Sequence, residues 1–293
     1  MEIAKTTGRR VSISGMLKHL GVSRSGYRAF LKHKPTTSQK RRNVIKDKIQ
    51  QVYDDSHQIY GAPKIAVELR KNGERIATRT VGKYMREMGI RAHWVKHWTK
   101  TTIDSDIDNK LQNILNEQFN PDRPNAVWCT DITYICTYDG FVYLTSVMDL
   151  FSRKIIAWTL SDSLEASYVI ETINKAKATR STVLPLIIHS DRGSQYVSAA
   201  YAEVTRNMQR SYSRTGNPYD NACIEAFHSV IKREWINRFR IQGLHQARML
   251  VFEYIETFYN TVRSHSHCGY VSPDEYEKEY QKLISKYQPA LVA

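Results

Sequence analysis

A series of short apolar segments beginning at Val127 places the strongest constraint on the fold of this chain. Residues 127–135, 141–148 and 154–160 are rich in β-branched and aromatic side chains, and Tyr138-Asp139-Gly140 between the first two is typical of a hairpin turn. We expect a helix over 165–177, a buried strand over 184–189, and helices over 198–208, 218–239 and 244–262. Antiparallel strands, a crossover helix and then another strand predict an α/β fold, a mixed sheet with helices on its faces.

Three carboxylates in this region have unusual surroundings. Asp131 lies inside an apolar run, Asp191 directly follows the apolar stretch 184–190, and Glu225 lies in a segment of helical character. A carboxylate within or at the end of a buried strand costs free energy unless something compensates its charge. A divalent cation does so when several such groups converge, and Mg²⁺ prefers oxygen ligands. The sequence therefore predicts a metal site.

All of the excess positive charge lies in the first third of the chain. Residues 1–100 hold 23 Lys and Arg against 7 Asp and Glu, residues 101–293 hold 20 against 22, and the whole chain carries +14. Such asymmetry favours nucleic acid as a partner, because Lys and Arg contacts release counterions from phosphate backbones. An anionic membrane is the weaker alternative, since no basic amphipathic anchor is evident.

The chain also gives expectations about its compartment. No apolar run approaches the roughly 18 residues that span a bilayer, and the N-terminus has no apolar segment of a secretory signal. We expect a cytoplasmic protein without membrane contact. The four cysteines do not match common zinc spacings and are interpreted as free thiols.

Residues 11–33 predict two short helices joined at Gly21, with Ser23 capping the second. This is the pattern of a helix-turn-helix, and a plain packing hairpin is the alternative. The second helix would present the candidate DNA contacts Arg24, Ser25, Tyr27 and Arg28.

A second helical unit follows the linker 34–38. Helices expected at about 39–55, 62–72 and 78–88 form another helix-turn-helix candidate. Solvated surface charge is the alternative interpretation of its basic residues. The candidate DNA contacts here are Lys64 and, on one side of the last helix, Arg79, Lys83 and Arg86.

A polar connector with a helix at about 107–118 then leads to Pro121 and Pro124, which mark a boundary. We therefore expect five regions: a helix-turn-helix segment (1–36), a second helical DNA-binding domain (37–92), a linker (93–124), a catalytic core (125–240) and a C-terminal helical extension (241–293).

Residues 127–280 closely resemble the catalytic part of bacterial insertion-sequence transposases of the IS-three family, relatives of retroviral integrases. Upstream, Gly21-Val-Ser-Arg-Ser-Gly-Tyr27 and Ile59-Tyr-Gly61 extend the resemblance over nearly the whole chain. The catalytic motifs are Trp128-x-x-Asp131-x-Thr133-Tyr134, Asp149-Leu-Phe-Ser-Arg153, His189-Ser-Asp-Arg-Gly-Ser-Gln-Tyr196, Ser213-Arg-x-Gly-Asn-Pro-Tyr-Asp-Asn-Ala222-x-x-Glu225, Lys232-x-Glu234, Tyr259-Asn260 and Ser272-Pro273.

The resemblance implies a ribonuclease-H-like core preceded by all-α DNA-binding domains. It also implies a DDE active site in which Asp131, Asp191 and Glu225 bind metal. We assign two Mg²⁺ ions, with Mn²⁺ as a substitute; Asp131 would bridge both, and each of the others would hold one. The substrate would be double-stranded DNA, cleaved at the element ends and then joined to other DNA, first into a circle intermediate. Two ends must be brought together, so we expect at least a dimer on DNA.

Two departures from the family pattern are visible. The chain has 33 residues between Asp191 and Glu225, about two fewer than the family usually shows, and we expect the shortening between Tyr196 and Ser213. The family usually fuses an upstream helix-turn-helix and zipper segment to its catalytic part by frameshifting. No zipper heptad is readable here, so the chain resembles the downstream product or the catalytic part of a longer polyprotein. We expect the upstream segment as a partner, and the protein itself at the nucleoid.

Further residues near the trio are candidates for DNA contact. Lys232 follows Glu225 by two helical turns and is expected on the same face. An ordinary surface lysine is the alternative interpretation of Lys232. The additional candidates are Arg192, Arg214 and Asn221. For Arg192 and Asn221, a turn-stabilising role is an equal alternative.

Other polar residues of the core are interpreted as structural. We expect Asp149 to form an ion pair with Arg153, and His189 to be a histidine of the strand end. Tyr134, Tyr196 and Tyr219 are expected to pack or to stack on DNA. Hairpin, turn and helix-terminus roles are expected for Asp139, Asp162 and Asp220, respectively.

Three other functions remain open at this point. A hydrolase without strand transfer would use the same carboxylates, and a DNA-binding regulator would retain a dead catalytic fold. The presence of all three carboxylates argues against the regulator. A tyrosine or serine recombinase is weaker still, because it would need no acidic trio.

Overall fold

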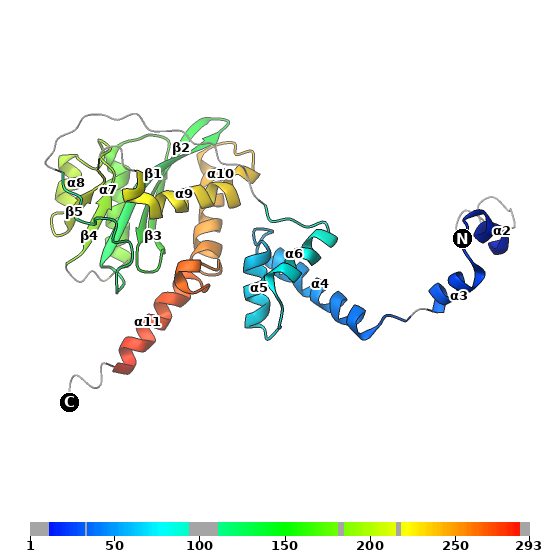
Figure 1. The fold of residues 1–293 in the computed structure, drawn as a ribbon. Helices are drawn as coiled ribbons and strands as arrows, with labels where there is room; N and C mark the ends of the chain where they lie inside the picture. Colours follow the sequence, from blue (N-terminus) through cyan, green and yellow to red (C-terminus); the bar gives the residue numbers. More distant parts are fainter. Residues whose placement is uncertain (1–11, 33, 94–110, 181–184, 215–217, 288–293) are drawn as a thin grey trace. The chain divides into compact units, whose positions relative to one another are not determined.

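The computed structural model describes residues 12–32, 34–93, 111–180, 185–214 and 218–287. It divides into two units, residues 1–51 and 52–293, each treated by itself below. The first contains helices α2 (Ile13–His19) and α3 (Arg24–Lys32) and most of α4 (Thr37–Asp55) (Figure 1). The predicted helix pair is confirmed. The left-handed backbone of Gly21 (φ 65°) lies between the helices, and the Ser23 hydroxyl accepts a hydrogen bond from the Gly26 N–H.

The second unit opens with the end of α4, followed by α5 (Ala62–Lys71) and α6 (Thr78–Glu87). The predicted helix pair is again confirmed, to within a residue at each end. Pro63 stands in the first turn of α5, where a missing N–H does no harm, and Gly73 (φ 83°) lies in the turn between the helices. Apolar residues at helical spacing, Ile65 and Leu69 on α5 and Val81 and Met85 on α6, are buried.

A five-stranded sheet forms the centre of this unit, in the order β3-β2-β1-β4-β5. The antiparallel strands β1 (Val127–Thr137), β2 (Gly140–Asp149) and β3 (Ile155–Ser161) were all predicted. Strands β4 (Ile187–Ser190) and β5 (Gln209–Tyr212) are added in parallel to β1. Three antiparallel strands extended by parallel ones, with helices in the connections, make a ribonuclease-H-like α/β fold.

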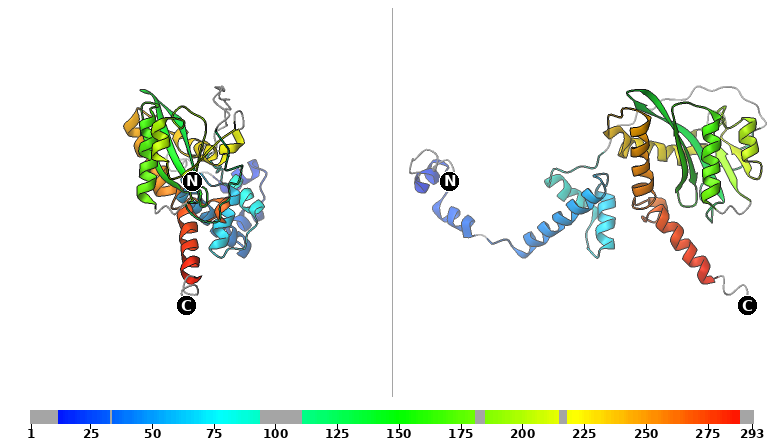
Figure 2. Two further views of the ribbon diagram at one scale, coloured as in Figure 1. Left: turned by 90° about the vertical axis from the view of Figure 1, so that its left-hand side faces the viewer. Right: turned by 180° about the vertical axis from the view of Figure 1, so that it is seen from behind.

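Helices cover both faces of the sheet (Figures 1 and 2). Side chains alternate along a strand, so neighbours on β1 face opposite ways. Trp128 joins a buried cluster with Val169 and Ile173 of α7 (Ala166–Thr179) and with Tyr201 of α8 (Ala199–Val204). Asp131, of opposite parity, meets α9 (Ala222–Glu234) instead. The site described below therefore lies on the α9 face.

The prediction of a helix at 107–118 is wrong for the part of that segment that the structure describes. Residues 111–118 are not helical, and 107–110 lie outside the described ranges. The Ser211 hydroxyl accepts hydrogen bonds from the N–H groups of Ile114 and Leu115, and Tyr212 N–H donates to the Gln112 carbonyl. The segment is thus held along β5, and the positive φ angles of Asn116 (45°) and Glu117 (59°) are incompatible with a helix.

Three further helices differ from expectation. The helix expected at 198–208 ends at Val204, and β5 follows it without having been predicted. The long helix expected at 218–239 is divided into η1 (Pro218–Asn221), α9 and η2 (Ile236–Arg238), because Trp235 leaves helical geometry (φ −135°). Its ring packs edge-on against His57 and Phe239, so tertiary contacts override the local pattern.

The helix expected at 244–262 becomes α10 (Leu244–Phe252) followed by a π-helix, η3 (Glu253–Tyr259). Hydrogen bonds from residue i to i−5 widen its turn, as in Asn260 N–H to the Ile255 carbonyl. The wider turn buries two adjacent pairs, Tyr254 with Ile255 and Phe258 with Tyr259.

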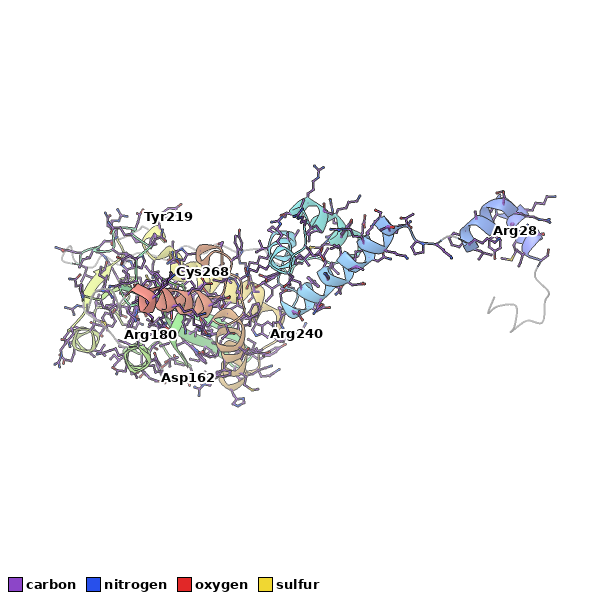
Figure 3. All side chains as sticks on the ribbon, turned by 90° about the horizontal axis from the view of Figure 1, so that it is seen from below. Arg28, Asp162, Arg180, Tyr219, Arg240 and Cys268 are labelled. Carbon is purple, nitrogen blue, oxygen red and sulfur yellow. The ribbon has the colours of Figure 1, made fainter. Side chains whose placement is uncertain are left out.

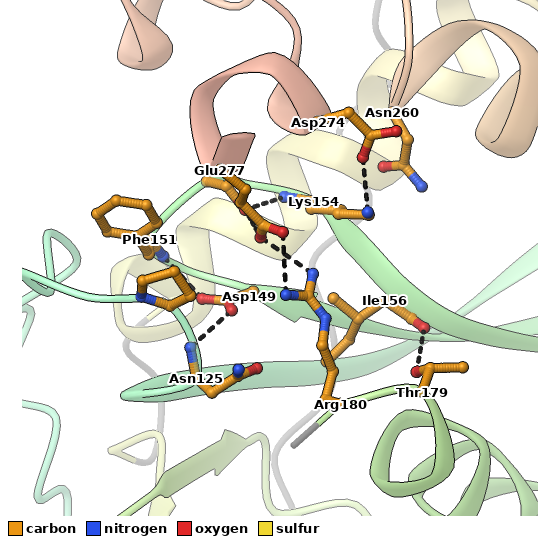
Figure 4. Close-up of polar contacts among 12 residues, drawn as sticks. Asn125, Asp149, Phe151, Lys154, Ile156, Thr179, Arg180, Asn260, Asp274 and Glu277 are labelled. Atoms are coloured by element: carbon orange, nitrogen blue, oxygen red, sulfur yellow. Dashed lines mark hydrogen bonds and ion pairs between the residues drawn. The ribbon is translucent and has the colours of Figure 1, made fainter. Parts of the chain in front are cut away.

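The described chain ends with η4 (Ser266–Cys268) and α11 (Pro273–Tyr287), which is anchored on the core (Figure 4). The buried Glu277 carboxylate accepts hydrogen bonds from both terminal nitrogens of Arg180, each at 3.0 Å, and from the Ser152 hydroxyl at 2.6 Å. Lys154 pairs with Asp274 at 2.6 Å. Among the residues described, no helix is long and apolar enough to cross a membrane.

Candidate active site

Asp131 and Asp191 emerge at corresponding positions of two adjacent parallel strands. The β1–β4 pairing ends with Cys129 opposite His189, and each aspartate follows two residues later. Strand ends of this kind are where open α/β sheets bind ligands, because the backbone splays apart and exposes side chains there. The Gly193 N–H donates to Asp191 Oδ1 at 2.9 Å and fixes the turn after β4.

Glu225 enters the same region from the first turn of α9. Ile224, Phe227 and Ile231 form the buried stripe of this helix and hold it against the protein. Glu225 itself keeps contact with solvent. The structure therefore brings the three predicted carboxylates together from a strand, a strand end and a helix.

Electrostatics support this proximity. Desolvation, followed by the charge of Asp131, raises the pKa of Asp191 to about 6, although its side chain still reaches solvent. Desolvation and then the charges of Asp131 and Asp191 raise the pKa of Glu225 to about 7. Carboxylates that oppose one another's ionisation carry negative charge that a divalent cation would neutralise, and their oxygens are suitable donors. Within the described ranges, however, no three acidic, histidine or cysteine side chains are close enough to form a ready metal cage.

His228, which the sequence analysis did not single out, contacts Asp131 directly. Its Nδ1 lies 3.2 Å from Asp131 Oδ2, and its Nε2 lies 3.3 Å from the Ser146 hydroxyl. The sequence signal that could have identified His228 is its position one helical turn after Glu225. That spacing places both residues on the same side of α9, but it does not show which strand residue His228 contacts.

Lys232 lies on the same helix, two turns after Glu225. Its ammonium nitrogen is 4.3 Å from the centroid of the Tyr134 ring, and burial lowers its pKa. Tyr134 is half exposed and packs edge-on against Phe141 across the β1–β2 hairpin. The lysine is therefore held by an aromatic platform and is not a freely moving surface side chain.

The turn that leads into α9 is clamped. The fully buried Asp220 carboxylate accepts hydrogen bonds from the backbone N–H, Nε and Nη2 of Arg214 at 2.7, 3.0 and 2.7 Å, and Arg214 also pairs with Glu117. Asn221, 3% exposed, has an amide without a hydrogen-bond partner among the described residues. Tyr219 projects from this turn and is 72% exposed (Figure 3).

Several neighbouring polar residues have structural partners. Arg192 donates to the carbonyls of Ser213 and Leu111. His189 is fully buried between the hydroxyls of Ser211 and Ser213, and burial lowers its pKa to about 4. The structural interpretation of His189 agrees with these contacts.

The ion pair expected between Asp149 and Arg153 is wrong. Asp149 instead accepts hydrogen bonds from the N–H groups of Asn125 and Phe151 (Figure 4), and desolvation raises its pKa to about 6. Arg153 donates to the carbonyls of Phe119 and Leu150, because its left-handed backbone (φ 62°) turns it away from the carboxylate.

The predicted DNA-contact residues of the first third of the chain differ in their exposure to solvent. Arg24, Ser25 and Arg28 are exposed on α3, where Tyr27 is half-buried. On α6, all three basic residues are exposed: Arg79, Lys83 and Arg86. Lys64 differs, because its ammonium nitrogen lies 4.8 Å from the Tyr60 ring centroid and burial lowers its pKa to about 8.

A mixed sheet with one acidic residue within its central strand, a second directly after the adjacent parallel strand and a third on the covering helix is the arrangement of integrase-type catalytic cores, enzymes of the polynucleotidyl-transferase type. Family models agree: the integrase core domain matches residues 121–218, a second integrase core model matches 206–273, and an HTH-like domain matches 40–98.

Two curated relatives extend this match over most of the chain. The transposase for insertion sequence element IS904 of Lactococcus lactis subsp. lactis is 37% identical over 247 residues, 84% of this chain and 98% of the relative. Transposase InsF for insertion sequence IS3A of Escherichia coli is 35% identical over 272 residues, 92% of this chain and 94% of the relative. The chain belongs to the IS-three (IS3) family of insertion-sequence transposases.

Among solved structures, the catalytic core domain of BIV integrase covers 56% of this chain and 99% of its own, with a TM-score of 0.41 and 15% identity. The family assignment does not depend on this distant likeness.

Proposed function

We propose that this chain is a DDE transposase that cleaves DNA at the ends of an insertion sequence and joins the freed ends to other DNA. One observation carries the proposal: Asp131, Asp191 and Glu225 lie in one region on adjoining elements, where desolvation and then the charges of the neighbouring aspartates raise the pKa values of Asp191 and Glu225. Carboxylates whose pKa values are shifted by burial and by one another's charges are typical of functional sites.

The three carboxylates, Asp131, Asp191 and Glu225, would hold Mg²⁺. When bound, the metal supplies a polarised phosphate and stabilises charge on the attacking and leaving oxygens. Carboxylate oxygens are the donors that Mg²⁺ prefers, so the chemistry of these three residues fits the ion.

Cleavage forms a bond between a water oxygen and phosphorus and breaks the bond to the 3′-oxygen of the element strand. The water gives up a proton and the released 3′-oxygen takes one up, and the water-derived oxygen remains on the 5′-phosphate of the flanking segment of the same strand. In strand transfer the 3′-hydroxyl forms a bond to another phosphorus while that phosphodiester loses its own 3′-oxygen. One ester is exchanged for another, so no external energy source is needed.

Other residues would place the DNA. Lys232, fixed on Tyr134, would contact a phosphate beside the scissile bond, and Arg192, Arg214 and Asn221 surround the same region. The exposed basic residues of α3 and α6 would bind the double-stranded element ends and target. Because two ends must be joined, we propose a homodimer or larger assembly on DNA, in the cytoplasm at the nucleoid, with an upstream helix-turn-helix and zipper segment as a further partner.

The test uses labelled duplexes that carry the element ends, incubated with Mg²⁺ and either the wild-type chain, Asp131→Asn or Asp162→Asn. Asp162 is an exposed acid outside the site (Figure 3), so its variant is the matched control. We expect joined products from wild type and Asp162→Asn and none from Asp131→Asn. Persistent joining by Asp131→Asn would overturn the assignment. Cleavage without joining would identify a nuclease, and binding without cleavage a regulator.

A further inference from the structure

His228 connects helix α9 to the strand that carries Asp131. Its two ring nitrogens reach two neighbouring strands, Nδ1 to Asp131 on β1 at 3.2 Å and Nε2 to Ser146 on β2 at 3.3 Å. Asp131 and Ser146 are directly opposite each other in the β1–β2 register, so they share one face of the sheet. The imidazole therefore bridges a cross-strand pair from above.

The chemistry of these partners limits what each ring nitrogen can do. A carboxylate oxygen only accepts, so an N–H on Nδ1 is the group that can donate to Asp131 Oδ2, 3.2 Å away. The Ser146 hydroxyl lies 3.3 Å from Nε2 and can accept from it or donate to it.

Burial makes this arrangement rigid. His228 is 5% exposed and Ser146 is fully buried, and the Phe227 ring lies 5.5 Å from the imidazole. An Asp131 side chain without this donor would be free to rotate about its χ angles. With it, Oδ2 has a nitrogen 3.2 Å away, and Oδ1 has no such partner among the described contacts.

We propose that His228 is a positioning residue that orients Asp131 for metal binding, a role that rests on the metal-dependent function proposed above. The contact with Nδ1 would hold Oδ2 and leave Oδ1 for the metal. Glu225 and His228 are one turn apart on α9. The helix therefore carries one proposed metal ligand, Glu225, and also carries the histidine that would orient a second, Asp131. Loss of such a supporting partner typically weakens metal affinity by about 10- to 100-fold.

Two substitutions separate this role from simple packing. The amide nitrogen of Asn lies the same number of bonds from Cβ as histidine Nδ1, whereas that of Gln corresponds to Nε2. His228→Asn thus retains a donor for Asp131, and His228→Gln retains only the reach toward Ser146. Gln is the better helix former, so any difference in favour of Asn cannot come from helix propensity.

The experiment measures Mn²⁺ binding to the full chain without DNA, by calorimetric titration, with thermal unfolding recorded for each variant. We expect His228→Asn to bind Mn²⁺ within about threefold of wild type and His228→Gln to bind it about tenfold or more weakly. Equal Mn²⁺ affinity of His228→Gln and wild type, or equal losses in His228→Asn and His228→Gln, would overturn the positioning role.

Two further variants keep the outcomes distinct. If His228→Gln does not fold, Ser146→Ala decides: weakened Mn²⁺ binding in a folded protein supports the role, and unchanged binding overturns it. Asp131→Asn tests the proposed function itself. If it binds Mn²⁺ as tightly as wild type, the metal site is elsewhere, whatever the His228 variants show.

Discussion

The ammonium of Lys232 rests on the face of Tyr134, 4.3 Å from the ring centroid, and so couples helix α9 to the β1–β2 hairpin. A cation–π contact at a partly exposed position is worth about 0.5–1 kcal/mol, which corresponds to about a two- to fivefold change in affinity. We expect Tyr134→Ala to weaken binding of an element-end duplex by that factor, measured by fluorescence anisotropy at fixed salt. Tyr134→Phe retains the ring and should bind as wild type does.

A double-mutant cycle with Lys232→Gln identifies the cause. Tyr134→Ala should have little further effect once the ammonium is gone. Fully additive losses would show that the tyrosine contacts DNA independently of the lysine.

The acidic site gives a prediction about pH. The folded pKa values of Glu225, about 7, and Asp191, about 6, exceed the ordinary values of 4.5 and 3.8. Between about pH 4 and 7 the folded chain therefore binds more protons than the unfolded chain, and these groups lower the free energy of unfolding as pH rises. Mg²⁺ competes with those protons, so it should raise Tm more at pH 8 than at pH 5.5.

Scanning calorimetry at both pH values, with and without Mg²⁺, measures this effect. The Asp191→Asn and Glu225→Gln double variant should show a smaller Mg²⁺ effect with little pH dependence. A stabilisation that is as large in the double variant as in wild type would place the bound metal elsewhere.

The end of α9 is predicted to depend on an ion pair. Glu234 accepts two hydrogen bonds from Arg263, both at 2.7 Å, and a third from the Tyr254 hydroxyl at 2.6 Å, and both charged groups are largely buried. Breaking a buried pair on one side leaves an uncompensated charge, so Glu234→Ala should lower the free energy of unfolding by about 3–5 kcal/mol in urea titrations. Replacing both residues by Met should recover part of the loss.

A surface pair offers the control for that measurement. Lys175 and Glu171 lie 2.7 Å apart, but each side chain is 48% exposed. Glu171→Gln should change the free energy of unfolding by no more than about 0.5 kcal/mol. A similar effect of Glu171→Gln and Glu234→Ala would contradict the importance of burial.

DNA binding by α6 is predicted to appear in the salt dependence. If Arg79 and Lys83 each contact a phosphate, alanine at either position should reduce the slope of log affinity against log salt by about 1. Lys64→Ala should leave that slope unchanged, because the Lys64 ammonium is packed on Tyr60. An unchanged slope for Arg79→Ala and Lys83→Ala would exclude α6 from the phosphate contacts.

Some elements could be predicted because residues close together in the sequence indicate them. Strands β1–β3 and helices α5–α7 were predicted from apolar periodicity, a hairpin turn or helix-end residues within each segment. Strand β5 could not be found this way. Gln209 and Arg210 are exposed, and the strand exists because β4 pairs with it in parallel and residues 112–115 bond to its last residues.

The site was predictable to the level of its carboxylates, and their assignment as metal ligands stays a prediction. Their partners were not predictable, since they come from distant segments. His228 meets Asp131 across 97 positions of sequence, and Arg192 donates to the carbonyl of Leu111, 81 residues away. Motif spacing identifies residue types that suit a reaction, whereas only the packing of α9 on β1 shows which side chains support them.

The Arg214–Asp220 clamp has a consequence for how such chains change in length. Its hydrogen bonds tie the entrance of α9 to the end of β5, so the position of Glu225 is set locally. Insertions or deletions between Tyr196 and β5 can then accumulate without displacing the glutamate. We expect the 33-residue interval between Asp191 and Glu225 to vary in length among related enzymes, while the 12 residues from Arg214 to Glu225 tolerate no change in number.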